Sequence, residues 1–233
     1  MDSGNNPTDT EKRSENSWAA PVARLEVAEM PAGALNLNVQ GRQLSGLVRG
    51  FGQMWQKTYK IRLEGTDVTP SQVIETWKKN FSSFWPKGYR FYGRPAGIAP
   101  GDVAVLNLSP GGLNVPGGLP LVSTGIMVIY ADEESFSFMT PQGHMFAGMI
   151  TFSSYDDHGT VAQVQALVRA SDPLIEVVFR LGGTKPAARA SVTAAGRPKS
   201  GTIGGQEAFN KTGIRRVFMR GSPPQRPITR ATP

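Results

Sequence analysis

The chain has 233 residues, no cysteine and a formal net charge of +7. The absence of cysteine excludes disulfides, thiol nucleophiles and thiolate metal sites. No apolar run approaches the roughly 18 residues of a membrane span, and the polar N-terminus lacks the apolar core of a secretory signal. We therefore expect a cytoplasmic protein without an integral membrane segment.

The positive charge is concentrated at one end of the chain. Residues 184–233 carry ten basic side chains and a single acid, Glu207, whereas residues 1–183 have a net charge of −2. The basic residues alternate with Gly, Pro and Thr and form no nucleic-acid-binding motif. We expect residues 184–233 to be a basic, mostly disordered tail that makes at most weak contact with polyanions.

The N-terminal part of the chain is predicted to be irregular. Residues 1–22 are polar and aperiodic, which predicts a disordered tail. Residues 23–50 hold scattered apolar positions broken by glycines, so they are interpreted as an extension of a domain that spans residues 23–183. The first convincing element is "MWQKTYKIRL", in which Trp55, Tyr59 and Ile61 share one period-two face, as in a half-buried strand.

A helix follows in "TPSQVIETWKKNFSSFWPKG". Thr69 is suited to the N-cap, Pro70 to the first helical position and Gln72 to the third position of a capping box. A stripe of apolar residues recurs at three- and four-residue spacing: Val73, Ile74, Trp77, Phe81 and Phe84.

The remainder of the domain reads as a β-meander closed by a short helix. Five strand-like runs lie between Gly101 and Ala170, separated by short turns such as "DEE", "PQGH" and "DDHG". The final helix is predicted to begin at Pro173 after the cap Asp172, with its buried stripe at Leu174, Val178 and Leu181. Hairpin-connected strands with helices on one face predict the α+β class.

One stretch, "TPQGHMFAGMITFSSY", carries a more specific pattern. Gly143 is suited to a positive φ in a turn, and Gly148 predicts a bulge or a close backbone approach within a strand. The order Gly143-His144, Gly148, Phe152 resembles the "GH…G…F" signature of the DUF1990 family, and the resemblance covers roughly Lys57 to Gly183. It implies a START-like (SRPBCC, Bet v 1-like) helix-grip architecture, in which a curved antiparallel sheet packs on helices.

This architecture favours the binding of an apolar small molecule, such as a lipid or a polyketide-like compound, without a cofactor. Ligand pockets are mainly apolar with a few polar anchors, although aromatic residues of this kind are more often plain core. The candidate ligand-binding residues are Tyr59, Trp77, Phe81, Tyr130, Phe138, His144, Phe152 and Gln163.

Two alternatives stay open. The chain could be an enzyme on the same scaffold, cyclase- or hydrolase-like, with His144 as the acid or base. That role needs a partner within hydrogen-bond reach, and because the nearby sequence offers none, a histidine that holds a turn is favoured. The other alternative is an interaction with polyanions through residues 184–233. No metal site is expected, because the adjacent residues Asp156, Asp157 and His158 cannot all point one way.

Overall fold

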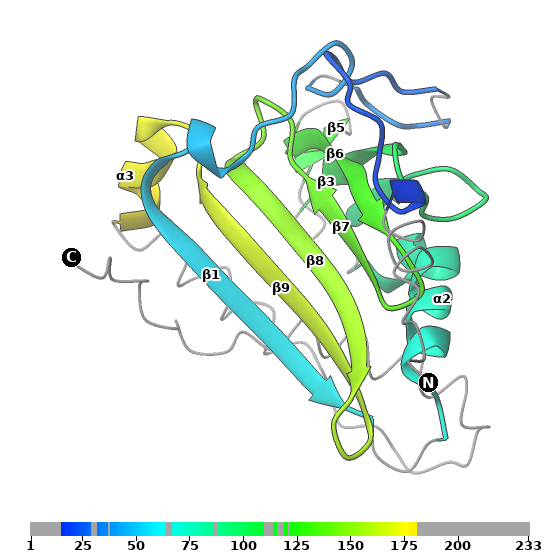
Figure 1. Cartoon of the computed structure of the whole chain (residues 1–233). Coiled ribbons are helices and arrows are strands. Elements are labelled where there is room, and N and C mark those ends of the chain that lie inside the picture. Colours follow the sequence, from blue (N-terminus) through cyan, green and yellow to red (C-terminus); the bar gives the residue numbers. More distant parts are fainter. Residues whose placement is uncertain are drawn as a thin grey trace, which may run out of the picture.

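The computed structural model describes residues 15–28, 32–36, 38–63, 67–85, 88–109, 114–115, 119–120 and 122–180. Its main element is a seven-stranded sheet with the strand order β1-β9-β8-β7-β6-β3-β2 (Figure 1). The elements of the chain are η1 (Leu47–Arg49), β1 (Phe51–Arg62), α2 (Pro70–Asn80), η2 (Phe81–Phe84), β2 (Tyr89–Tyr92), β3 (Val103–Leu108), β4 (Asn114–Val115), β5 (Leu119–Pro120), β6 (Val122–Ala131), β7 (Ser135–Met139), β8 (Phe146–Asp156), β9 (Thr160–Ala170) and α3 (Pro173–Arg180).

All neighbouring strands of this sheet pair antiparallel, and β3, β6, β7, β8 and β9 follow one another as a meander. The first strand, β1, joins the far edge by pairing with the last strand, β9. The sheet is curved, and α2 packs on one of its faces (Figure 1). The predicted α+β class, a curved antiparallel sheet packed on helices, is therefore confirmed. We call the face that carries α2 the inner face and the opposite one the outer face.

Helix α2 begins as the sequence predicts. The Thr69 hydroxyl accepts a hydrogen bond from the Gln72 amide at 3.4 Å, and the Gln72 side chain accepts one from the Thr69 amide at 3.0 Å. The α-helical part ends at Asn80 and continues as the 3₁₀ turn η2. All five side chains of the predicted stripe are buried, so the helix presents its apolar side to the sheet.

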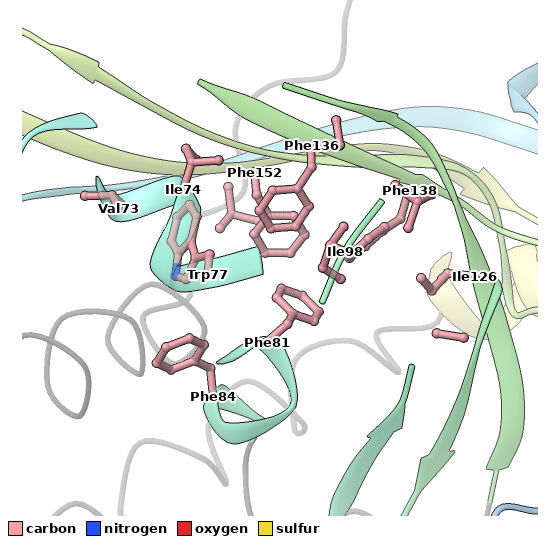
Figure 2. Close-up of a cluster of buried hydrophobic side chains, with 14 of the residues drawn as sticks. Val73, Ile74, Trp77, Phe81, Phe84, Ile98, Ile126, Phe136, Phe138 and Phe152 are labelled. Atoms are coloured by element: carbon pink, nitrogen blue, oxygen red, sulfur yellow. The ribbon is translucent and has the colours of Figure 1, made fainter. Parts of the chain in front are cut away.

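The main core lies between α2 and the inner face of the sheet (Figure 2). Because successive strand residues point to opposite faces, each strand contributes every second residue to it. Phe136 and Phe138 of β7 and Phe152 of β8 are examples, each at most 3% exposed. Together with Trp77 and Phe81 they form one continuous cluster of rings, which holds the helix against the sheet.

The outer face is covered in part by the N-terminal segment. Leu25 and Val39 are at most 1% exposed and form a second, smaller core with Val105 and Met127. The prediction of disorder extended to residue 22, but the described residues from Glu15 onward are tied to the sheet. The Ala19 amide donates to the Ile129 carbonyl at 3.0 Å, beyond the end of β3. Residues 1–14 and 181–233 lie outside the described part of the chain.

Helix α3 begins at Pro173, and the Asp172 carboxylate accepts a hydrogen bond from the Ile175 amide at 3.0 Å, as predicted. The buried side of α3 differs from the predicted stripe, because Leu174, which was expected to be buried, is 74% exposed. The residue that faces the sheet is Glu176, which is 7% exposed and accepts a hydrogen bond from the Gln53 amide of β1 at 3.3 Å. The side chain of Val178, and Leu181, lie outside the described residues. In the described part of the chain, no helix is long and apolar enough to span a membrane.

Candidate functional site

Four of the candidate ligand-binding residues come together beneath α2. The ring centroid of Phe81 lies 5.1 Å from that of Phe152 and 5.2 Å from that of Phe138, and Trp77 lies 5.6 Å from Phe152. All four side chains are at most 3% exposed. Edge-to-face contacts at these distances are those of a packed aromatic core. The four residues therefore fill the space between α2 and the sheet, and Phe81 also borders a small hollow at the C-terminal end of α2.

Tyr59 lies farther along the inner face, on the edge strand β1. It is only partly buried and packs against the border of the aromatic core. Burial raises the pKa of its hydroxyl above the usual value, so the group stays protonated and can donate a hydrogen bond at neutral pH. Tyr59 is thus the candidate whose position fits a polar anchor beside an apolar surface.

Tyr130 and Gln163 lie on the outer face and do not join the other candidates. Tyr130 is opposite Ser137, which points away from the inner-face residues Phe136 and Phe138, after an irregularity in the β6–β7 pairing. Its hydroxyl donates to the Asp132 carboxylate, and this bond raises the pKa of Tyr130. Gln163 is opposite Ser153 and donates to its hydroxyl at 3.4 Å. The sheet therefore separates both side chains from the four candidate residues that lie beneath α2 on the inner face.

His144 lies in the turn between β7 and β8, after Gly143, which has the predicted positive φ of 87°. The Phe146 amide donates to Nδ1 of His144 at 3.0 Å, which fits a neutral ring that carries its proton on Nε2. Burial lowers the pKa of His144 to about 4. Among the described residues, the polar contacts of the ring are both between Nδ1 and the Phe146 backbone, and because Nδ1 accepts from the amide it cannot also donate to the Phe146 carbonyl oxygen, 3.2 Å away. This arrangement holds a turn and provides no acid–base partner.

The inner face also has a part that α2 leaves uncovered, which we call the open strip. It consists of five partly exposed apolar residues on three neighbouring strands: Trp55, Tyr59, Ile150, Ala166 and Val168. Trp55 is opposite Val168, and Ala166 lies between Lys57 and Ile150 in one cross-strand row. Since these residues share the face of the aromatic core, the open strip continues that core toward the edge of the sheet.

Sequence reasoning left four of these five residues out of the candidate site. The alternation in "MWQKTYKIRL" already placed Trp55 and Lys57 on the same face as Tyr59. The alternation could not show that the part of the strand around Trp55 extends past α2. Ile150, Ala166 and Val168 have no distinguishing local signal, because their exposure depends on where α2 and α3 lie.

The comparisons give no family. No family model matches the sequence, and no curated protein sequence matches it. Similar solved structures include major latex-like protein 151 from Panax ginseng, with 15% identity over 59% of this chain and 98% of that one and a TM-score of 0.36. The di-domain ARO/CYC StfQ from the steffimycin biosynthetic pathway shares 10% identity over 60% of this chain and 44% of that one, with a TM-score of 0.40.

A third structure, norcoclaurine synthase from Thalictrum flavum, shares 14% identity over 67% of this chain and 94% of that one, with a TM-score of 0.39. Each of these three solved structures matches only part of this chain. The α+β fold of this chain follows from its own strand order and from the position of α2. The DUF1990 resemblance stays a prediction.

Proposed function

We propose that this protein binds a small apolar molecule against the open strip. The observation that carries the proposal is the contrast within one face of the sheet. The aromatic side chains Phe136, Phe138 and Phe152 beneath α2 are at most 3% exposed, whereas Trp55, Ile150 and Val168 remain partly exposed although they are apolar. Contiguous apolar surface that the described residues leave partly exposed favours an apolar ligand, because its burial releases water from both partners.

The open strip has polar groups at its border that could orient such a ligand. Lys57 lies in the same cross-strand row as Ala166 and is exposed. The protonated Tyr59 hydroxyl lies one inner-face position farther along β1. An ammonium and a hydroxyl beside an apolar surface fit a molecule that combines an apolar body with a hydrogen-bond acceptor or an acidic group. This ligand class agrees with what the DUF1990 and START-like resemblance implies.

The competing functions receive less support. His144 is engaged by the Phe146 backbone and stays neutral, so the acid–base role suggested for it gains nothing from the structure. Residues 184–233, on which an interaction with polyanions would depend, lie outside the described residues. We therefore place the function at the open strip and assign no reaction to it.

The proposal can be tested with the purified full-length protein and the dye 8-anilinonaphthalene-1-sulfonate, an apolar ring system that carries an acidic group. The variant Ala166→Trp adds bulk in the centre of the open strip without removing a packed side chain. The matched control Gln165→Trp places the same indole side chain one residue earlier, on the outer face, where Gln165 donates to the Thr58 hydroxyl at 3.2 Å.

We expect Ala166→Trp to weaken dye binding about tenfold or more, which corresponds to about 1.4 kcal/mol, and Gln165→Trp to leave it nearly unchanged. Equal affinities in all three proteins would show that the dye binds elsewhere and would contradict the proposal. Native mass spectrometry of the freshly purified protein then identifies any apolar molecule that it retains. Such a molecule should be displaced by the dye in the wild type.

A further inference from the structure

A second, separate feature is a half-open hollow of about 130 Å³ at the C-terminal end of α2. It lies between the last turn of α2, the turn η2 and the connection from β2 to β3. Its lining includes Lys78, Lys79, Ser82, Arg94 and Gly97. A cavity of this size holds several water molecules, so it is large enough for a small ionic group.

The hollow brings together three cations from two separate segments, and none of the described residues that line it is acidic. Lys78 donates from Nζ to the carbonyl oxygen of Asp132 at 2.9 Å, which is a neutral partner, and its charge is offset only by a weak electrostatic interaction with the exposed Glu75. Lys79 pairs with Glu75, but both side chains are at least 60% exposed, so water and salt screen this pair. Two of the three charges are therefore only weakly compensated.

Arg94 comes from the connecting segment and is held in place. Its Nη1 atom contacts the Asp102 carboxylate at 3.1 Å, and the same carboxylate accepts a hydrogen bond from the Ala99 amide at 3.0 Å. Because a guanidinium has five N–H groups, this single contact leaves other donors for a ligand. The segment lies close against the helix end, since a Cβ atom on Gly97 would be 2.9 Å from the Lys78 carbonyl oxygen.

A simpler interpretation is that the two lysines only offset the negative end of the helix dipole. That end is equivalent to about half an elementary charge, which one lysine would already exceed. The dipole also does not explain Arg94, which the chain supplies from outside the helix. The positive charge around the hollow is thus larger than the helix end requires, even with the Asp102 contact counted.

We propose that the hollow binds the phosphate group of a small organic phosphate. Three cationic side chains, from two segments that line the hollow, match the three terminal oxygens of a phosphate ester better than the two oxygens of a carboxylate. The Ser82 hydroxyl in the lining is a further hydrogen-bond donor. This site is independent of the proposed apolar ligand, because it lies beside β2, at the opposite edge of the sheet from the open strip on β1.

The test titrates the full-length protein with inorganic phosphate and with glycerol 3-phosphate at low ionic strength, by isothermal calorimetry and by backbone amide NMR shifts. The variants Lys78→Met, Lys79→Met and Arg94→Gln each remove one charge and keep most of the side-chain length. Lys60→Met is the matched control, since it removes a cation from the outer face, where Lys60 contacts the Tyr155 hydroxyl. Thermal unfolding verifies that each variant is folded.

We expect saturable binding that each hollow variant weakens roughly tenfold or more, with shifts at the amides of Ser82 and Gly97. The control Lys60→Met should bind like the wild type. Tighter binding of glycerol 3-phosphate would identify the ester as the ligand, and equal or tighter binding of inorganic phosphate would overturn that assignment. If all four variants lose affinity equally, or if millimolar phosphate gives no saturable binding, the site does not exist.

Discussion

The two halves of the inner face of the sheet differ although they share the strands β8 and β9. Beneath α2, the rings of Trp77, Phe81 and Phe152 are packed together and almost fully buried. Toward β1, Trp55 and Val168 have apolar side chains of the same kind but remain partly exposed. We call these regions the filled half and the open half. Their side chains are similarly apolar, so composition does not explain the difference.

Length explains it. An α-helix rises 1.5 Å per residue, so the 11 residues of α2 extend roughly 16 Å. A strand rises about 3.3 Å per residue, so the 12 residues of β1 extend roughly 40 Å. One short helix cannot cover strands of this length, and α3, which contacts β1 and β9, meets β1 near its start, where the Gln53 amide donates to Glu176. This difference in coverage teaches that a sheet can be packed for stability in one half and leave the other half available for the ligand binding that we propose.

The largest expected effect separates the two halves by stability. Phe152→Ala removes a ring that is 1% exposed and leaves a cavity beneath α2, so it should lower the free energy of unfolding by about 3–5 kcal/mol. Trp55→Ala removes a larger side chain from the open half but should cost less, about 1–2 kcal/mol, because part of its surface is already in water. Urea denaturation followed by circular dichroism measures both. Equal losses would mean that the open half is packed like the filled half.

A second effect concerns the boundary of the open half, where Gly148 is opposite Val168. Gly148 has a φ of 153°, and a Cβ atom there would lie 2.2 Å from the Leu167 carbonyl oxygen. Gly148→Ala should therefore destabilise the protein by about 3 kcal/mol, through backbone strain and displacement of β8 from β9. Gly101 provides the control, because its φ is 89° but a Cβ atom added to it would have no neighbouring atom within 4 Å.

Gly101→Ala should cost only the strain of its backbone conformation, roughly 1–2 kcal/mol. Dye binding at the open strip should weaken in Gly148→Ala and persist in Gly101→Ala when both are measured well below their unfolding temperatures. A Gly148→Ala protein as stable as the control would show that β8 and β9 can separate at this point without cost.

The filled half was largely predictable from the sequence, and the open half was not. The capping box at Thr69 and the stripe from Val73 to Phe84 are local patterns, and a helix of that register has to bury that side. Tyr130 lies on the outer face because an irregularity in the β6–β7 pairing precedes it, and the sequence alone gives no signal for that irregularity. In "TVAQVQALVRA" both faces hold apolar residues, so alternation alone could not place Gln163.

The N-terminal segment shows the same limit. Ala19 joins the sheet by a backbone hydrogen bond to Ile129, a partner more than a hundred residues away. Backbone pairing of this kind needs no particular side chain, so a polar, aperiodic stretch gives no signal for it. The exposure of the open strip is also non-local, since it results from the ends of α2 and α3 and not from the strand residues themselves.

A third effect is a pH dependence at the turn that leads into β8. His144 has a pKa of about 4 in the folded protein because burial disfavours the charged ring, whereas an unfolded histidine has a pKa of about 6.5. Between these values the unfolded chain binds more protons than the folded one. This contribution to stability is therefore complete above pH 6.5 and is lost as the pH falls toward 4, by about 2–3 kcal/mol in total.

The measurement compares urea midpoints at pH 7 and pH 4.5. In His144→Asn the drop between the two pH values should be smaller than in the wild type, since asparagine has no proton to gain and its amide oxygen can accept from Phe146. His158→Asn, which replaces the other histidine of the chain in an exposed hairpin turn, should show the full drop. A full drop in His144→Asn as well would assign the pH dependence to other groups.

The smallest expected effect acts on the filled half alone. Thr69→Ala removes the hydroxyl that accepts from the Gln72 amide, and the loss of such a cap costs about 1 kcal/mol. Thr69→Ser restores an acceptor at the same position and should recover most of the stability. Hydrogen exchange should quicken at the first-turn amides of α2 in Thr69→Ala and stay unchanged across the β1–β9 pairs. If the β1–β9 amides were to open together with α2, the two halves would form one cooperative unit, and the open half could not rearrange around a ligand without loosening the aromatic core.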